Sequence, residues 1–567
     1  MKPSRSIAIR FLAAVGCGIA SAMLGSAIAA ADGGPDLAAI DRYVRSEMDV
    51  QRIPGLALGI VHGDRIVHVQ GFGKADRSGP DVTPQTPFLI GSVTKSFTAL
   101  AIMQLSEAGR VQLDAPVQRY LPWWRVADPD ASTQVTVRHL LYQVSGLSKA
   151  TGNAYATNGD THDSALEDRV RALRDAKLTE PVGMTWQYSN ANYWTLGMLV
   201  QAVSGQSYET YIQQHIFDPL QMRNSYTSQA TAKQHGLPTE HRYWYGFPVA
   251  TDLPFDRGGL GAAGLSSSAL DMARYLGLYL NDDRHGATAL VTPAGAAELQ
   301  RPGVPTGVEG VSYAMGWDVS PLHGVPTVSH DGSGFGSHAN VVFVPDREWG
   351  VVVMENGENS PDEFFGSRRM TSIANGVTDM LIGQESPAPT SSSRSLWVVY
   401  GVVLGIIAVQ VVGMARSVRT IRGWRADPLR RPTGALQIGL RVGLPVLVSW
   451  SWALIVLVGL PRMIRAPLPA MLMGLPDLGY PLVASAVLAF GWGLARAIWA
   501  IRTLRTAPPR VPRPLNGATV PAVLERPRPS RAPPPVKETR CPPLHSRRPR
   551  LAPRAWFCGT PWSASSS

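Results

Sequence analysis

Cysteine is nearly absent from this chain: three occur in 567 residues, at positions 17, 541 and 558. A domain folded from the long stretch between the first two has no disulfide and must be held together by its own core. The zinc-binding pattern His-Glu-x-x-His and the glycine-rich phosphate-binding loop are missing as well. These absences argue against a zinc enzyme and against a phosphate-loop nucleotide-binding protein.

Excess positive charge is confined to two segments, although the formal net charge is +11. Residues 502–567 hold thirteen basic and two acidic side chains, and residues 416–431 hold six arginines and one aspartate. The rest of the chain is mildly acidic. The basic isoelectric point therefore gives no reason to expect nucleic-acid binding.

Long apolar runs occur in two regions, at the N-terminus and between residues 396 and 495. Residues 1–31 have basic side chains, then an apolar stretch, then the small-x-small site Ala27-Ile28-Ala29, which is typical of a secretory signal peptide. Residues 396–415, 442–460 and 478–495 each have about the length of a membrane-spanning helix, roughly 20 residues. Buried core helices are the alternative, but three adjoining runs with arginine-rich flanks favour a membrane region.

The same features predict domain boundaries and orientation. The expected order is a signal peptide (1–31), a main domain (32–385), a Pro/Ser linker (386–395), three transmembrane helices (396–501) and a basic, Pro-rich disordered tail (502–567). Removal of the signal would leave the main domain outside, and the six arginines of 416–431 would lie inside. We therefore expect an inner (cytoplasmic) membrane protein with a periplasmic or extracellular main domain and a cytoplasmic tail.

The main domain carries both helix and strand patterns. The expected elements are a helix over 35–51, strands at 56–61 and 66–71, a long helical middle, strands at 327–330, 340–344 and 350–354, and a closing helix over 361–382. Strands from both ends of the domain would share one antiparallel sheet, with the terminal helices packed on it. The predicted class is mixed α/β (α+β), with an antiparallel sheet flanked by helices and an all-helical subdomain.

Ser92 and Lys95 form a Ser-x-x-Lys tetrad where an apolar run meets a helical pattern. If a helix starts at Ser92, Lys95 lies one turn on and on the same face. A serine needs a neighbouring base to attack at neutral pH, and a lysine can serve once burial favours its neutral form. The tetrad alone also fits a helix-capping serine followed by a solvated lysine, so other motifs must decide between the two.

Tyr188-Ser189-Asn190 is the first of these motifs and follows a Pro/Gly turn. A phenol can relay a proton, and an amide can hold a substrate carbonyl. A second Tyr-x-Asn begins at Tyr279, but it lies in a helical pattern and is predicted to pack in the core. Context therefore selects the copy at Tyr188.

His330-Asp331-Gly332-Ser333-Gly334 is the second motif and ends a strand-like run. Glycines on either side of Ser333 allow a substrate to approach the backbone closely. A backbone N–H there can face that of Ser92 and form an oxyanion hole. The alternative is a simple turn after an edge strand.

In this order, Ser92-x-x-Lys95, Tyr188-x-Asn190 and His330-x-Gly332 resemble the motifs of the serine β-lactamase and penicillin-binding-protein superfamily, specifically its class C β-lactamase-like branch. Segments similar to the family surround them at 105–117, 137–147, 264–273 and 344–346. The resemblance covers about residues 36–385. It implies a β-lactamase/transpeptidase-like fold.

The resemblance also implies a mechanism in which serine attacks a carbonyl and water or another acceptor releases the acyl group. It assigns Ser92, Lys95 and Tyr188 to catalysis, the backbone N–H groups of Ser92 and Ser333 to the oxyanion hole, and Asn190, His330 and Gly332 to substrate binding. No metal and no organic cofactor are implied. The expected partners are a small-molecule or peptide substrate and the membrane, without nucleic acid and with no prediction of oligomeric state.

His330 departs from the family, since many members have lysine there. Histidine is mostly uncharged at neutral pH, so a preference for carboxylate-bearing substrates is expected to strengthen as pH falls through the usual histidine range. The expected function is a membrane-anchored, outward-facing serine hydrolase acting on amide or ester bonds, such as D-amino-acid peptides or β-lactams. The alternatives are a carboxylesterase without a cell-wall role and a catalytically idle, membrane-held binding or sensor protein.

Overall fold

The computed structural model describes residues 34–155, 158–253, 256–280, 290–334, 336–358, 369–385, 388, 394–464 and 466–506. The predicted signal peptide lies outside these residues, as do most of the linker and the tail beyond Thr506.

Strands from the two ends of the main domain share one antiparallel sheet, as predicted. Among the described residues it has eight strands in the order β2-β1-β12-β11-β10-β9-β8-β7. β1 pairs with β12, with Leu58 opposite Val353. The strand bounds are β1 Gly55–His62, β2 Arg65–Gly73, β7 Val304–Pro305, β8 Ser312–Tyr313, β9 Asp318–Leu322, β10 Val325–Ser333, β11 His338–Val344 and β12 Trp349–Glu355.

The central strands are valine-rich because both faces of the sheet are covered. All seven residues of β11 are buried, as is β12 from Gly350 to Glu355. β-Branched side chains suit such a two-sided environment. Strands β7, β8 and β9 were not predicted, because they are short and only partly buried and so lack an apolar pattern.

Helices α2 (Leu37–Gln51) and α14 (Arg369–Leu381) cover one face of the sheet, and α11 (Ala269–Leu280) covers the other. Asp36 starts α2 by accepting a hydrogen bond from the Ala39 backbone N–H at 2.9 Å. The part of the predicted closing helix before Arg369 lies outside the described residues.

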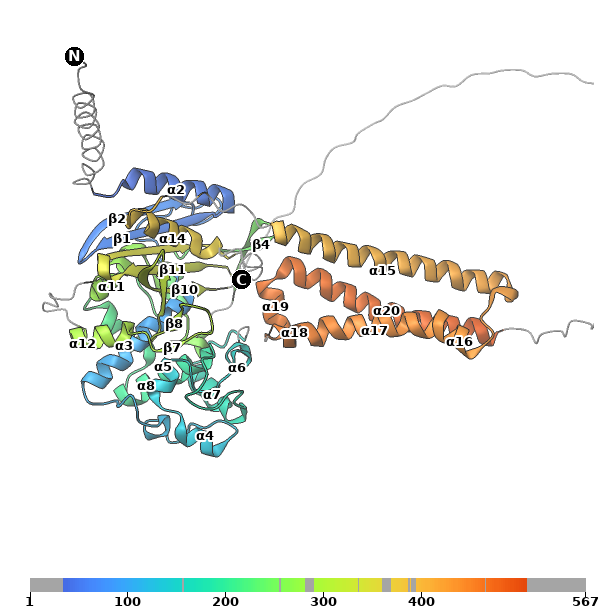
Figure 1. Ribbon diagram of the computed structural model, residues 1–567, viewed down its shortest axis with the longest axis horizontal. Coiled ribbons are helices and arrows are strands. Elements are labelled where there is room, and N and C mark those ends of the chain that lie inside the picture. The colour runs from blue at the N-terminus through green and yellow to red at the C-terminus, as the bar shows by residue number, and fades with distance from the viewer. Residues whose placement is uncertain are drawn as a thin grey trace, which may run out of the picture. The chain divides into compact units, whose positions relative to one another are not determined.

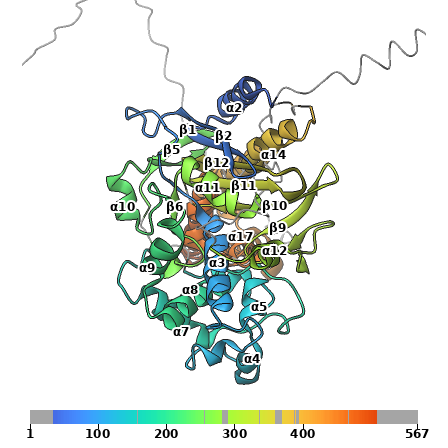
Figure 2. The same ribbon diagram turned by 90° about the vertical axis from the view of Figure 1, so that its left-hand side faces the viewer.

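A helical subdomain lies beyond the α11 face, below the sheet in Figure 2. Its main helix, α8 (Asn190–Ser204), is buried along most of its length and packs against α3 (Thr94–Glu107). The shorter helices are α4 Pro129–Gln134, α5 Val137–Leu141, α6 Lys149–Asn153, α7 Ala165–Ala172 and α9 Tyr208–Ile212. The all-helical subdomain was predicted, and it supplies one wall of the site described below.

Three helical segments among the described residues are long and apolar enough to cross a membrane: Leu396–Ala426, Ala435–Met463 and Pro476–Arg505. The first belongs to α15 (Arg394–Ala426) and the third is α20 (Pro476–Arg505). α15 continues through residues 416–426, which were predicted as loop. The extension is amphipathic, because Ile421 and Trp424 are buried against Val442 and Ala500 while the four arginines of residues 416–426 are exposed.

Candidate active site

Ser92 lies in a short 3₁₀ turn, Gly91–Val93, that leads directly into α3. This turn places Lys95 in the first turn of the helix, one turn after the serine as the motif predicted. The Lys95 Nζ atom lies 2.8 Å from Ser92 Oγ. Lys95 is fully buried, so the alternative of a solvated lysine is wrong.

Lys95 has a second hydrogen bond that the sequence did not suggest. Its Nζ donates to the backbone carbonyl of Ala262 at 2.8 Å. Burial lowers the pKa of Lys95 to about 7, and the negative charge of Asp331 opposes that shift. A substantial fraction of the lysine is therefore a neutral amine near neutral pH, which is the form a base requires.

Tyr188 contacts the same serine from the other side. Its hydroxyl donates to Ser92 Oγ at 2.9 Å, and its ring lies 4.9 Å from Lys95 Nζ. Burial raises the pKa of Tyr188 well above its ordinary value. The tyrosine consequently stays a protonated phenol at neutral pH, and Lys95 is the better candidate for the base.

Asn190 is the first residue of α8, so its side chain projects from the helix start just beyond Tyr188. Among the described residues, its buried Oδ1 atom has no hydrogen-bond partner. A buried amide oxygen without a partner is costly unless another group, such as a substrate N–H, supplies one. The second Tyr-x-Asn copy behaves as predicted, since Tyr279 is buried in α11 and contacts the Tyr275 hydroxyl at 2.9 Å.

His330 lies on β10 just after the point where pairing with β9 ends. β9 pairs with β10 from Val325 to Ser329, so that pairing ends one residue before His330. β11 continues on the other side through Ser333. The His330-Asp331-Gly332-Ser333 segment therefore presents one backbone edge that β9 does not use, which is where an extended substrate can add hydrogen bonds.

His330 is neutral, and its ring lies beside those of Tyr188 and Tyr313, with centroids 6.4 and 6.3 Å away. Its Nδ1 donates to the Asp331 carbonyl at 2.5 Å, which leaves Nε2 as the acceptor, and Nε2 has no partner among the described residues. Burial lowers the pKa of His330 to about 4. The expectation that His330 gains charge through the usual histidine range is therefore wrong, because the site excludes water from the ring.

Glycines bring β10 against the 3₁₀ turn that holds Ser92. A Cβ on Gly332 would lie 2.0 Å from the Ile90 carbonyl oxygen and 3.1 Å from the Ser92 nitrogen. Gly91 has φ +48 and faces Gly332. Only glycine permits this approach, and it brings the end of β10, where Ser333 follows, beside the Ser92 backbone.

Gln143 supports Tyr188 and Asn190 from behind and has no sequence motif that points to it. The residue is fully buried and has φ +60, which is unusual for a non-glycine residue. Its Oε1 accepts hydrogen bonds from the Ser189 backbone N–H at 3.0 Å and from Asn192 Nδ2 at 2.5 Å. Gln143 thus fixes the segment between the two motif residues.

A half-buried serine with a buried lysine and a phenol on its oxygen, beside a glycine-rich strand edge, is the arrangement used by serine hydrolases with a Ser-x-x-Lys motif. Comparison with protein families matches residues 40–375 to the Beta-lactamase family. The chain therefore belongs to the Beta-lactamase family.

Relatives and solved structures agree with this placement. The chain is 28% identical over 320 residues to Protein flp of Staphylococcus aureus (strain MW2), covering 56% of this chain and 62% of that protein's length. It is 29% identical over 317 residues to Penicillin-binding protein 4 of Amycolatopsis lactamdurans, covering 54% and 81%. The structure of the octameric penicillin-binding protein homologue from Pyrococcus abyssi matches with a TM-score of 0.55 and 28% identity, covering 63% of this chain and 79% of that one. The mixed fold with its antiparallel sheet is thus the penicillin-binding-protein and β-lactamase fold.

Proposed function

We propose that this chain is a membrane-anchored, outward-facing serine hydrolase that cleaves amide or ester bonds through an acyl-enzyme. The observation that carries the proposal is the double contact of Ser92 Oγ, with Lys95 Nζ at 2.8 Å and Tyr188 OH at 2.9 Å. Family membership supports serine hydrolase activity in general. The apolar helices at Leu396–Ala426, Ala435–Met463 and Pro476–Arg505 support the membrane anchor.

In the first step of the proposed reaction, Ser92 Oγ attacks the substrate carbonyl and its proton passes to the neutral amine of Lys95. The oxyanion that forms accepts hydrogen bonds from the backbone N–H groups of Ser92 and Ser333. As the tetrahedral intermediate collapses, Tyr188 gives its proton to the leaving group and is reprotonated from Lys95. Asn190 holds the substrate, with its unpartnered Oδ1 accepting from a substrate N–H.

Release of the acyl group repeats these steps with water in place of the leaving group. Water attacks the ester carbon, its proton passes to the Lys95–Tyr188 pair, and Ser92 regains its proton as the ester bond breaks. Another acceptor with an amine or hydroxyl can take the place of water. The proposed substrates are D-amino-acid peptides or β-lactams.

A carboxylesterase is the second candidate, and His330 favours it. A lysine at this position would offer a permanent cation to a substrate carboxylate, whereas burial lowers the pKa of His330 to about 4 and keeps it neutral. An enzyme with a neutral histidine here has less preference for substrates that carry a carboxylate beside the scissile bond than an enzyme with lysine.

Intact-mass spectrometry of the full chain after mixing with a penicillin tests the proposal, with Ser92→Ala as the control. A penicillin-sized adduct on the wild type alone supports Ser92 as nucleophile and D-alanyl peptides as substrates. Drug consumption without a lasting adduct supports β-lactam hydrolysis. With neither result, hydrolysis of p-nitrophenyl acetate by the wild type but not by Ser92→Ala would support the esterase. Equal behaviour of both proteins toward both reagents would contradict the proposal and favour the idle binding protein.

A further inference from the structure

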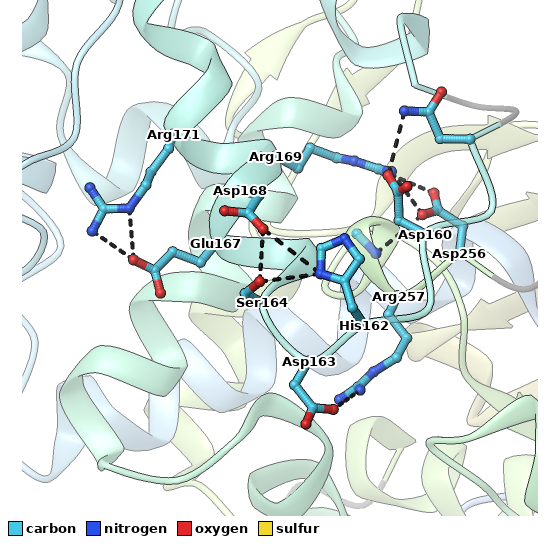
Figure 3. A network of polar contacts seen from close by, with 12 residues as sticks. Asp160, His162, Asp163, Ser164, Glu167, Asp168, Arg169, Arg171, Asp256 and Arg257 are labelled. Atoms are coloured by element: carbon cyan, nitrogen blue, oxygen red, sulfur yellow. Dashed lines mark hydrogen bonds and ion pairs between the residues drawn. The ribbon is translucent and has the colours of Figure 1, made fainter.

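Arg169 is the centre of the polar network in Figure 3. Its guanidinium contacts Asp256 through two bonds, of 2.5 and 2.8 Å, and Asp160 through one bond of 3.1 Å. The Arg169 side chain is only 2% exposed. A buried charge of this kind is costly to leave unpaired, so the guanidinium holds the two carboxylates together strongly.

Asp256 begins the short 3₁₀ helix η5 (Arg257–Gly259) and accepts a hydrogen bond from the Gly258 N–H at 3.2 Å. The Arg169 guanidinium lies directly against Gly258, since a Cβ at that glycine would be 2.5 Å from Arg169 Cζ. The backbone N–H of Arg257 donates to the Asp160 carbonyl at 2.7 Å. The start of the segment 256–262 is therefore fixed to the α7 side of the helical subdomain.

Gly261 fixes the other end of this segment. A Cβ there would lie 2.4 Å from the Tyr193 carbonyl oxygen of α8. The Gly261 carbonyl also accepts a hydrogen bond from Thr98 Oγ1 of α3 at 2.7 Å. The next residue is Ala262, and its carbonyl accepts from Lys95 Nζ at 2.8 Å.

We infer that Arg169 and Asp256 are positioning residues for Lys95, because they hold the segment whose Ala262 carbonyl fixes the lysine amine beside Ser92. This inference rests on the proposed function. An amine that donates one N–H to Ala262 has its lone pair directed by that bond. The Ala262 carbonyl is in direct contact with the fully buried amine, so a segment held less tightly would let water reach the amine.

The charges around Lys95 determine what water would do there. The titratable groups that face the amine are Tyr188 and Tyr193, whose rings lie 4.9 and 5.8 Å from Nζ, and His330 and Asp331 of β10. Both tyrosines are neutral at neutral pH because burial raises their pKa, and His330 is neutral because burial lowers its pKa. Burial is also the main reason that the pKa of Lys95 is low. Admitting water must therefore raise the pKa of Lys95.

The test compares Asp256→Asn and Asp256→Ala with wild type in the full-length protein. The asparagine keeps an oxygen for the Gly258 N–H but loses the ion pair, whereas alanine loses both. Asp163→Asn is the matched control, because Asp163 belongs to the same network through Arg257, is 98% exposed and does not contact Arg169. The measured quantity is the rate at which a fluorophosphonate probe phosphonylates Ser92, with the serine oxygen displacing fluoride, from pH 5 to pH 10.

We expect the wild-type rate to rise with pH to a plateau, with a midpoint near the Lys95 pKa of about 7. In Asp256→Ala the midpoint should move up by about one pH unit, a roughly tenfold slower reaction at pH 6 that recovers toward wild type at pH 10. Asp256→Asn should show a smaller shift in the same direction, and Asp163→Asn should show none.

An unshifted midpoint overturns the inference, whether the rate is unchanged or is lowered equally at every pH as a merely structural role would require. If Asp256→Ala does not fold, as a thermal melt would reveal, Asp256→Asn decides. Absence of Ser92 labelling in the wild type would instead overturn the proposed function, and the inference with it. The two failures are therefore distinguishable.

Discussion

At the scale of single residues, Lys95 shows a conflict between stability and chemistry. A lysine in a fully buried position costs free energy whenever it carries a proton, and its two hydrogen bonds, to Ser92 and Ala262, offset that cost only in part. The chain retains the residue because a neutral amine next to the serine is what the proposed chemistry needs. Removal of this amine should therefore have opposite effects on stability and on activity.

Lys95→Met should stabilise the protein by about 1–3 kcal/mol at pH 6 to 7 and reduce acylation of Ser92 by roughly 10²- to 10⁴-fold. The folded-state pKa is about 7 and the ordinary value is 10.5, so between these the unfolded state binds the proton that the folded state lacks. Wild-type stability therefore rises with pH over that window, and the advantage of the variant shrinks. Thermal unfolding at pH 6 and pH 9.5 measures this difference. Lys74→Met, at a half-exposed lysine, is the control and should show no such dependence.

The residues of the three motifs were predictable because each motif is a short, local sequence pattern. Ser92 and Lys95 are one helical turn apart, and Tyr188 and Asn190 flank a single residue. Ala262 was not predictable, since it contributes a backbone carbonyl to a lysine 167 positions earlier. The identity of such a residue does not indicate which group its backbone carbonyl will bind.

At the scale of elements, the site depends on how closely β10 approaches the 3₁₀ turn before α3. The approach is made by Gly91 and Gly332, and it brings the Ser92 backbone beside the end of the strand. The motifs predicted which two segments meet. They did not predict that β9 stops pairing at Ser329, because β9 is a short, partly buried strand without an apolar pattern.

Gly332→Ala should reduce acylation of Ser92 by roughly 10²-fold or more, because the added methyl forces β10 away from Ile90 and separates the two oxyanion donors. The Ser92 labelling rate is the measurement. Gly277→Ala on α11 is the matched control, since its nearest neighbours would be 3.9 Å away and alanine favours a helix. Full labelling of Gly332→Ala would contradict this account of the approach.

A second prediction at this scale concerns Gln143, which connects the end of α5 to the start of α8. Gln143→Leu leaves the Ser189 N–H and the Asn192 amide without their acceptor, which should cost about 2–4 kcal/mol of unfolding free energy. Tyr188 and Asn190 lie on either side of Ser189, so the labelling rate of Ser92 should fall as well. Gln201→Leu removes a comparable bond, to the Tyr208 N–H, at the far end of α8. That variant should lose stability but keep its labelling rate, and equal rates for the two would show that Gln143 has only a structural role.

At the scale of the whole molecule, the composition changes sharply where the folded main domain ends. The sheet and its helices have valine, leucine and alanine inside and polar groups outside, which is the pattern of a water-soluble domain. The later helices have the reverse, with large apolar side chains such as Trp397, Leu404 and Leu447 exposed. Exposed apolar surfaces on helices of this length are typical of membrane-spanning segments. The sequence predicted this division because apolar runs of membrane length are unmistakable, although it ended the first helix too early.

The orientation of the chain in the membrane is the remaining prediction at this scale, and it follows from the distribution of arginines between the two connecting segments. Residues 416–431 hold six arginines, whereas 461–477 hold only two, so the former segment should be cytoplasmic and the latter outside. With three spans, the main domain would be outside and the tail inside. Met184→Cys, in the main domain at a residue 76% exposed, and Ala466→Cys, between the second and third spans, provide reporters of the outer side.

We expect a membrane-impermeant maleimide to label both engineered cysteines on intact cells. The native Cys541 and Cys558 of the tail are the internal control and should react only after the cells are permeabilised. Labelling of the tail in intact cells, together with protection of position 184, would reverse the orientation and place the hydrolase inside. A cell-wall substrate would then be out of reach, so a reversed orientation would exclude cell-wall peptides before any substrate is assayed.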